Sequence, residues 1–520
     1  MSLQRQGRAA ALASRFSIVA LLLAMAAVAV PLAAASAGGP KLKRTVTWPS
    51  TASSTSTTTS TTTTPTTTPP TTTPPTTTPP STAPPGSSTV QLEGQQLNGS
   101  WTQVADPGAT GGTAVQIQSG ALWATTSFPA GSYLLSVRVR SAGERIVLGI
   151  NSQQVATASV SGGWQTVSAP VHLNGTTSWG VMPLGPIGGQ PQQPVYVDWM
   201  ALTPTAATYT TLGNKIFDPS GAQFTPRGVN QAGLELAPTY PNFQDFNFYA
   251  MSLWGATIVR IPLSQSFWLS TDCSYDSGYA ARIDQIVQSI TTRGMVALLD
   301  LHTSHAGALC GPIVHPPMAD DHSVQFWTQV ANRYKSNPLV AFDLVNEPAY
   351  IDGKTWRDGG TVTTWHAVGM QQLYNTVRAT GATNLVFLSG LGWAYHVDVA
   401  LQYPVDGYGI VYSTHLYSQQ GTTGLPTGID AALLPTAAQY PVVAGEFGTQ
   451  LTSPTYNSSV IAYAESHGLG WIAFNWNVGP YPQNYALLDS FSTYQPSTAG
   501  VPVRDGLWKA KGWTNYGGYP

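Results

Sequence analysis

After residue 206 the chain alternates regularly between short apolar runs and longer amphipathic stretches, and this pattern constrains the fold more than any other feature. The apolar runs have the length of buried strands, and the stretches between them have the length of helices. Continuous apolar strands separated by helices predict a parallel sheet with both faces covered. The eight runs are PRGVN, TIVRIPL, MVALLDLH, LVAFDLVNE, NLVFLSG, GIVYSTHLY, PVVAGEF and GWIAFNW.

Eight strand–helix units within residues 206–520 predict a closed (β/α)8 (TIM) barrel in preference to an open sheet. Residues 278–294 and 361–381 are two of the predicted helical stretches. In such a barrel the chemistry gathers where the strands end, at their carboxyl termini. Polar residues at those strand ends are therefore the first candidates for a functional site.

Residues 89–205 have a different pattern of short alternating segments and no helical periodicity. Turn-forming residues separate the segments at intervals of about 8 to 12 residues, which is typical of an antiparallel β-sandwich. We therefore predict a jelly-roll-like sandwich ahead of the barrel. Its predicted strands include TVQLE, SYLLSVRVR, RIVLGI, WQTVSAPVHL and PVYVDWMAL.

The first 88 residues predict export and a spacer. Three arginines precede an apolar run and the small residues Ala35-Ser36-Ala37, which is the pattern of a signal peptide over 1–37; a retained signal anchor is the alternative. Residues 38–88 form a linker rich in Thr, Ser and Pro, which has little to bury and stays solvated. The mature protein is expected to be secreted, with no membrane contact after cleavage.

The charge of the chain limits its partners. The net charge is −2 and charged residues make up only 9% of the chain. This composition lacks the basic patch that nucleic acid requires, so we expect no nucleic-acid partner.

Only two cysteines are present, Cys273 and Cys310. In an oxidising compartment a disulfide between them is favoured over two free thiols.

Two glutamates stand out because each ends an apolar strand: Glu347 the fourth and Glu446 the seventh. An unpaired carboxylate buried there costs several kcal/mol, so two at one barrel mouth indicate a function. Cleavage of a glycosidic bond with retention needs one carboxylic acid and one carboxylate about 5 Å apart. The other glutamates after residue 200 have simpler interpretations: Glu235 as a rim or structural residue and Glu465 as a solvated one.

Further polar and aromatic residues end strands at the same level. Arg260 could keep a carboxylate ionised, and His415 and Tyr417 could orient the acid or the nucleophile. His302 closes the third strand. Trp476, at the eighth strand, offers a flat ring face for a sugar. Each of these residues alone could equally be part of the core.

These motifs together resemble glycoside hydrolase family 5, in particular Asn-Glu-Pro after the fourth strand and Glu-Phe-Gly after the seventh. The similarity spans residues 212–517. It implies that Glu347 is the general acid/base and Glu446 the nucleophile, and that Asn346 contacts the sugar 2-hydroxyl. By the same resemblance Arg260 and Tyr417 hold Glu446, His302 and His415 line the cleft, and Trp476 forms its floor.

Three features are not explained by the resemblance alone. In an ideal strand Asn346 and Glu347 would face opposite sides, so the chain must bend before Pro348 if both reach the cleft. The segment 303–321, after the third strand, is unlike the cellulase pattern and carries Cys310. Trp393, after the fifth strand, is a candidate second sugar platform, and a packing role is the alternative.

The predicted sandwich resembles carbohydrate-binding modules of families 6 and 35 through QLEGQ, AGSYLLSVRVR, WQTVSAPVHL and VYVDWMAL. In those modules calcium joins acidic residues near the two termini. The resemblance implies that Glu93 and Asp198 could hold a structural calcium, since carboxylate oxygens suit that ion.

These observations predict a monomeric, secreted, retaining endo-β-glycanase that needs no cofactor for catalysis. A β-1,4-glucan such as cellulose is the favoured substrate, and mannan, xyloglucan or a β-1,3/1,6-linked glycan are alternatives. A non-catalytic polysaccharide-binding or adhesion protein would have the same composition. Such a protein tends to lose one or both catalytic carboxylates, whereas this chain keeps both.

Overall fold

The computed structural model describes residues 88–91, 97–187, 190–240, 243–418, 424–449, 454–479 and 485–513. The predicted signal peptide, nearly all of the predicted linker and Glu93 lie outside this part of the chain. Within the described residues, no helix combines the length and the apolar character that crossing a bilayer requires.

The N-terminal described part is an antiparallel β unit, in agreement with the alternating pattern of 89–205. The very long β3 and β4 change register repeatedly, which allows them to bend back on the sheet. Leu135, Val137 and Trp179 are fully buried in its core. The strands are β1 (Ser88–Gln91), β2 (Asn98–Ala105), β3 (Thr113–Ile150), β4 (Gln153–Pro183) and β5 (Val195–Pro204), with a 3-10 turn at Thr110–Gly112.

Eight parallel strands close into a barrel, which confirms the predicted (β/α)8 architecture. Strand order follows the chain, and β18 pairs with β9 to close the ring. The strands are β9 (Arg227–Asn230), β10 (Ile258–Ser264), β11 (Val296–Thr303), β12 (Val340–Asp343), β15 (Val386–Ser389), β16 (Ile410–Tyr417), β17 (Val442–Gly448) and β18 (Gly470–Ala473).

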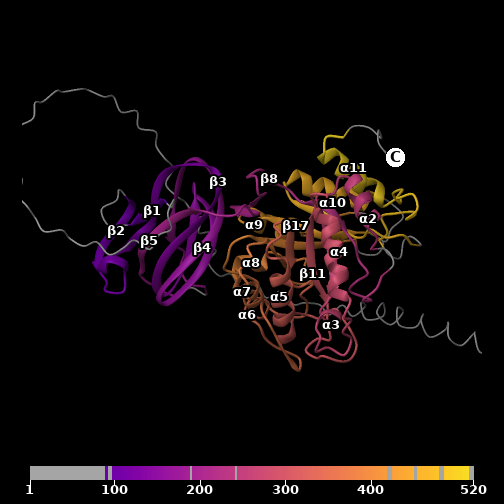
Figure 1. Cartoon of the computed structure of the whole chain (residues 1–520), viewed down its shortest axis with the longest axis horizontal. Coiled ribbons are helices and arrows are strands. Elements are labelled where there is room, and N and C mark those ends of the chain that lie inside the picture. Colours follow the sequence, from indigo (N-terminus) through magenta and orange to yellow (C-terminus); the bar gives the residue numbers. More distant parts are fainter. Residues whose placement is uncertain are drawn as a thin grey trace, which may run out of the picture. The chain divides into compact units, whose positions relative to one another are not determined.

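Helices cover the outside of the barrel, and Figure 1 shows α4, α5 and α10 running alongside the strands. The longest are α4 (Tyr279–Thr291), α5 (Asp321–Tyr334), α10 (Thr455–Ser466), α11 (Gly500–Ala510) and α7 (Met370–Ala379). The others are α2 (Asp245–Leu253), α3 (Gln265–Trp268), α6 (Gly353–Asp358), α8 (Val399–Gln402) and α9 (Ile429–Ala437).

One predicted helix begins later than the sequence pattern indicated. Residues 361–381 were predicted to be helical throughout, but a hairpin of β13 (Gly360–Val362) and β14 (Trp365–Ala367) occupies the first part. β-branched threonine and valine favour strand over helix. The helix α7 starts only after Gly369.

The amino-terminal end of the barrel interior is apolar. Alternate residues of each strand point inward, and Ile258, Leu298, Phe387, Val411 and Ile472 form a buried cluster there. A small antiparallel sheet packs Tyr209 and Ile216 against the same cluster. Its strands are β6 (Thr210–Leu212), β7 (Lys215–Phe217) and β8 (Gln223–Phe224). The polar residues of the interior therefore lie toward the opposite end.

Candidate active site

The same inward-facing alternation that builds the apolar end places charged groups at the carboxyl ends of the strands. On β11 the interior sequence runs from Leu298 to Asp300 and then His302, and on β10 from Ile258 to Arg260. All of these side chains are buried. The polar cluster is therefore a continuation of the barrel core and is held by rigid strands.

Arg260 organises this cluster, and every nitrogen of its fully buried guanidinium meets an acceptor. Nε donates to Asp343 Oδ2 at 2.8 Å, and Nη2 donates to Asn346 Oδ1 at 2.9 Å and faces Asp300 Oδ2 at 3.0 Å. Nη1 donates to Asn230 Oδ1 at 3.1 Å and to Glu446 Oε1. A planar group with five fixed donors is well suited to hold several acceptors at once.

The carboxylate of Glu446 is held on both oxygens. Besides the contact with Arg260, the hydroxyl of Tyr417 donates to Oε2 at 2.5 Å. Burial alone would raise the pKa of Glu446, but the charges of His415 and Arg260 and the hydrogen bond from Tyr417 outweigh it and lower the pKa to about 2. Glu446 is thus a stable anion in a buried place.

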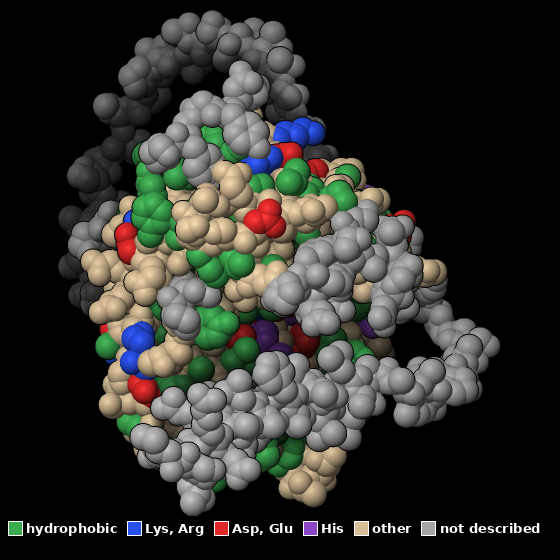
Figure 2. Space-filling view, turned by 90° about the vertical axis from the view of Figure 1, so that its right-hand side faces the viewer, with side chains coloured by type: hydrophobic (Ala, Val, Ile, Leu, Met, Phe, Trp, Pro, Cys, Tyr) green, Lys and Arg blue, Asp and Glu red, His purple; other side chains and the backbone are tan. Residues whose placement is uncertain are grey.

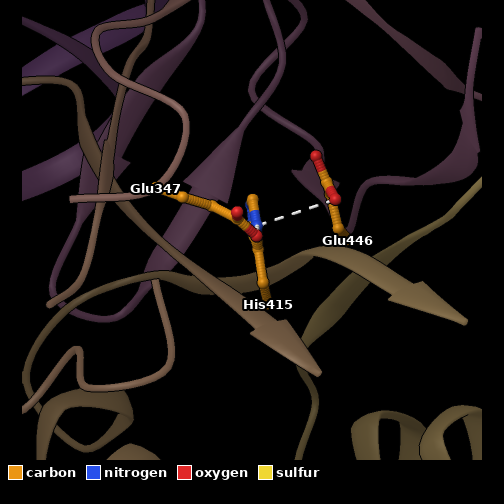
Figure 3. Close-up of side chains that lie close together, drawn as sticks. All are labelled: Glu347, His415 and Glu446. Carbon is orange, nitrogen blue, oxygen red and sulfur yellow. Dashed lines mark hydrogen bonds and ion pairs between the residues drawn. The ribbon is translucent and has the colours of Figure 1, made fainter. Parts of the chain in front are cut away.

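Glu347 approaches Glu446 from across the mouth, with His415 beside it (Figure 3). Nδ1 of His415 lies 2.8 Å from Glu347 Oε1 and 3.7 Å from Glu446 Oε2. One oxygen of each carboxylate and a ring nitrogen of His415 all lie within 4.8 Å of one another. Burial alone would lower the pKa of His415, but the neighbouring carboxylates Glu446 and Glu347 raise it.

Asn346 and Glu347 both reach the site because β12 ends at Asp343 and the chain then leaves the strand. The predicted bend is therefore present. The amide of Asn346 accepts from Arg260 and lies 3.4 Å from His302 Nε2. On its other side His302 bonds Asp300 Oδ2 through Nδ1 at 2.7 Å, and burial lowers the pKa of His302 to about 4. The imidazole is therefore neutral and its tautomer is set by Asp300.

Asp300 and Asp343 were not singled out in the sequence, yet both are fully buried against Arg260. Burial raises the pKa of each to about 7, and the positive charge of Arg260 opposes this rise. One arginine faces three carboxylates here, so a single positive charge must stabilise all three carboxyl groups. Removing one partner of such a buried pair costs about 3–5 kcal/mol of stability.

The prediction that Trp476 forms the floor of the sugar-binding cleft is wrong. Its side chain is fully buried, packs edge-on against Trp254 with ring centroids 4.7 Å apart, and points Nε1 at Asn247 Oδ1 3.3 Å away. It therefore has no ring face free for a sugar. Phe474, two residues earlier, is partly exposed and lies 6.3 Å from the ring of Tyr417 and 6.1 Å from that of Tyr485.

The remaining predicted residues fall in several places. Trp393 is half exposed near Glu347, and Cys273 and Cys310 form the predicted disulfide. Glu465 pairs with Arg227 on the surface, and Glu235 is buried. Asp198, a predicted calcium ligand, instead accepts from the Thr110 backbone and pairs with Arg138.

Figure 2 shows histidine and acidic side chains next to one another within a recess of this face of the molecule. Among the described residues, Glu347, His415 and Glu446 are the group whose donor atoms come close enough to hold a metal ion. The guanidinium of Arg260 contacts Glu446 directly. Its positive charge opposes a second cation at that carboxylate.

Residues 217–480 match the sequence model of the cellulase family, glycosyl hydrolase family 5. The match covers half of the chain and contains the whole polar cluster described above. The chain belongs to this family. It is therefore a glycoside hydrolase whose two strand-end glutamates face each other in a cellulase-family barrel.

The individual relatives are distant in sequence. A manganese-dependent endoglucanase of Phanerodontia chrysosporium is 30% identical over 209 residues, which is 37% of this chain and 50% of that protein. An endoglucanase of Paenibacillus polymyxa is 24% identical over 340 residues, 55% of this chain and 84% of that protein. The crystal structure of a beta-glucanase from Saccharophagus degradans is 22% identical, covers 59% of this chain and 94% of its own, and has a TM-score of 0.47.

Proposed function

We propose that this protein is a retaining endo-β-1,4-glucanase in which Glu446 is the nucleophile and Glu347 the general acid/base. The observation that carries the mechanism is the approach of the two carboxylates, whose nearest oxygens lie within 4.8 Å. Retaining glycosidases place their carboxyl groups about 5–5.5 Å apart, and inverting ones leave about 6.5–9.5 Å for a water molecule. The spacing here supports retention.

The surroundings of the two glutamates favour different roles. Glu446 is buried, bonded by Arg260 and Tyr417, and has its pKa lowered to about 2, so it is ionised and aimed. The side chain of Glu347 is 20% exposed and contacts His415 rather than Arg260. Double displacement requires an ionised nucleophile and a second carboxyl group that transfers protons, so the buried Glu446 suits the first role and the partly exposed Glu347 suits the second.

The reaction then proceeds in two displacements. In the first, Glu347 gives its proton to the glycosidic oxygen as the bond from that oxygen to the anomeric carbon breaks, and Glu446 forms a bond to the same carbon. In the second, Glu347 removes a proton from water as the water attacks the anomeric carbon and Glu446 departs. Asn346, beside Glu347, is positioned to contact the sugar 2-hydroxyl, while Arg260 and Tyr417 keep Glu446 oriented.

The β-1,4-glucan substrate is supported by the two relatives described above, both of which are named endoglucanases. Mannan, xyloglucan and β-1,3/1,6-linked glycans remain the substrates to compare. A non-catalytic binding protein is disfavoured because both carboxylates are present together with Asn346, Arg260 and Tyr417.

The proposed mechanism needs no metal. One relative is named manganese-dependent, and in this chain the closest metal-like group is the catalytic group itself. We expect dialysis against EDTA to leave kcat unchanged, since Arg260 already balances the charge of Glu446. Loss of activity that Mn²⁺ restores would contradict this part of the proposal.

The N-terminal assignments extend the proposal to the whole protein. We propose export through a signal peptide over 1–37, a linker over 38–88 and a carbohydrate-binding module over 89–205. The antiparallel sheet of the described part supports the module. The calcium site at Glu93 and Asp198 stays a prediction, and the pairing of Asp198 with Arg138 argues against it.

The test is Glu446→Gln, compared with Glu465→Gln as a matched control on the outer surface, where Glu465 pairs with Arg227. We expect the Glu446 variant to lose at least about 10³-fold in kcat while still showing a cooperative thermal unfolding transition, because Arg260 keeps Asp300 and Asp343 as partners. The control should keep its activity. Reducing-sugar release from a panel of cellulose, mannan, xyloglucan and β-1,3-glucan identifies the substrate, and activity confined to a glycan other than β-1,4-glucan would contradict the proposed specificity.

A further inference from the structure

Strict alternation along β17 would point Glu446 away from the cleft. Val443 belongs to the apolar cluster inside the barrel, whereas Ala444 belongs to the core between the strands and the outer helices. Because successive side chains of a strand point to opposite faces, Gly445 should then face the interior and Glu446 the helices. Glu446 nevertheless contacts Arg260 inside the barrel. An irregularity in β17 must therefore turn the chain.

The irregularity is a one-residue bulge at Gly445. Where β16 pairs with β17 the register shifts, so that Gly445 is passed over and Glu446 lies opposite His415. After the shift Phe447 faces outward, where its ring centroid lies 6.0 Å from that of Trp471 in the outer core. The bulge thus reverses the alternation and turns Glu446 into the barrel. Bulges are over-represented beside active sites, where they re-aim a side chain.

The bulge requires a residue without a side chain. A Cβ at position 445 would overlap Oγ of Ser413 and would lie 3.5 Å from Nε2 of His415. Ser413 is fully buried, so its hydroxyl has little room to move aside. Glycine at this position lets two successive residues of β17 lie on the side of the strand that faces β16 and the interior.

The side chain of Asn230, the last residue of β9, binds the backbone of this bulge. Its Nδ2 donates to the carbonyl oxygen of Gly445 at 3.1 Å and to that of Ile472 at 3.2 Å. Its Oδ1 accepts from Nη1 of Arg260 at 3.1 Å. The amide fits in this orientation alone, because a guanidinium has no acceptor and a carbonyl has no donor. Asn230 is fully buried, so water does not compete for these bonds.

We propose that Asn230 is a positioning residue that holds the bulge at Gly445 and thereby aims Glu446, an inference that rests on the proposed role of Glu446 as the nucleophile. Asn230 joins two supports of that carboxylate: the backbone just before it and the guanidinium that binds its Oε1. A fully satisfied buried network of this kind makes a site rigid. A reacting group that is misplaced by about 1 Å can lose about 10²-fold in rate.

The experiment compares Asn230→Asp with Asn384→Asp as a matched control. Asn384 is also buried, and its Nδ2 donates to the carbonyl oxygens of Asn337 and Val340 at 2.8 Å each, at the amino-terminal end of β12 and away from the cleft. Each substitution replaces a buried amide donor with a carboxyl group of the same size. We therefore expect both variants to lose thermal stability and only Asn230→Asp to affect the nucleophile.

The readout is the trapping of Glu446 by a 2-deoxy-2-fluoro β-cellobioside, in which Glu446 bonds to the anomeric carbon as dinitrophenolate departs. For Asn230→Asp we expect the limiting first-order rate constant of trapping to fall about tenfold to a hundredfold. The reagent concentration that gives half of this rate should change less than about threefold, because Asn230 does not touch the sugar. Asn384→Asp should trap at the wild-type rate. Equal limiting rates in the two variants, measured well below their unfolding temperatures, would overturn the proposal.

A second pair of variants tests the bulge directly and does not depend on the folding of Asn230→Asp. Gly445→Ala adds the Cβ that overlaps Ser413, and we expect trapping to slow about tenfold. Ser413→Ala removes a hydroxyl that has no hydrogen-bond partner among the described residues, so alone it should trap at nearly the wild-type rate. The double variant should recover most of the loss, because the overlapping atom is gone.

Wild-type trapping in Gly445→Ala, or no recovery in the double variant, would overturn the proposed bulge while leaving Glu446 as the nucleophile. A wild-type protein that cleaves β-1,4-glucan and is not trapped on Glu446 would overturn the proposed nucleophile itself, and with it this role of Asn230.

Discussion

The hydroxyl of Tyr417 lies 2.5 Å from Oε2 of Glu446 and donates a hydrogen bond to it. Burial alone would raise the pKa of Glu446, and this hydrogen bond is one of the interactions that lower it. Removing the Tyr417 hydroxyl should therefore make Glu446 harder to ionise and leave its carboxylate less firmly oriented. Loss of this one hydroxyl is the smallest change that tests how the site activates Glu446.

For Tyr417→Phe we expect kcat to fall roughly tenfold to a hundredfold, because one donor to a buried anion is lost. The acidic limb of the kcat profile should move to higher pH, since a carboxylate that loses a hydrogen bond to its charged form gains a proton more readily. A pH–rate profile from pH 3 to pH 8 measures both effects. An unchanged profile would show that Tyr417 does not tune the nucleophile.

For Glu347→Ala we expect a loss of kcat/KM whose size depends on the leaving group of the substrate. Natural oligosaccharides need a proton on the departing oxygen, whereas 2,4-dinitrophenolate leaves without one, so the first step on the aryl glycoside should be spared. Added azide should then accelerate turnover and give a β-glycosyl azide. Equal losses of kcat/KM on the oligosaccharide and on the aryl glycoside, or an α-glycosyl azide product, would contradict the acid/base role of Glu347.

Trp476 and Phe474 should respond oppositely to substitution. Trp476→Phe removes buried volume beside Trp254 and should lower the unfolding free energy by about 1–3 kcal/mol with little change in kcat/KM. Phe474→Ala should lower kcat/KM about tenfold with a smaller effect on stability, because Phe474 is partly exposed beside Tyr417. Urea unfolding and steady-state kinetics on both variants separate the two roles, and a reversed pattern would contradict the structural assignment.

Glu235 should make stability depend on pH. It is buried, and burial raises its pKa from 4.5 to about 7. The folded state therefore binds a proton that the unfolded state has released, so this group's contribution is full below pH 4.5 and is lost as pH rises through 7. We expect Glu235→Gln to be more stable than the wild type by about 1–3 kcal/mol at pH 8 and to show little difference at pH 4. Equal differences at the two pH values would contradict this linkage.

Much of the fold was predictable because strand and helix periods are properties of local sequence. The eight apolar runs became the eight barrel strands, and Glu347 and Glu446 were recognisable because each closed such a run. Asp300 could have been found by the same reasoning. It lies two residues before His302 on β11, and the period of a strand places both in the interior.

The predictions that failed lie where local periodicity ends. β18 stops at Ala473, so the orientation of Trp476 depends on the long-range contact with Trp254 and not on a strand pattern. The pocket lined by His315, Glu347 and Trp393 could not be predicted either, because three loops that are far apart in the sequence build it. Their meeting depends on backbone hydrogen bonds such as that from Trp393 to Pro348, which no sequence pattern encodes.

The most direct test is to identify the residue that becomes bonded to the sugar. A 2-deoxy-2-fluoro β-cellobioside with a dinitrophenyl leaving group should react with the protein and leave a stable glycosyl adduct. Mass spectrometry of the digested protein should place that adduct on Glu446. An adduct on any other residue, or no adduct in a protein that cleaves β-1,4-glucan, would contradict double displacement through Glu446.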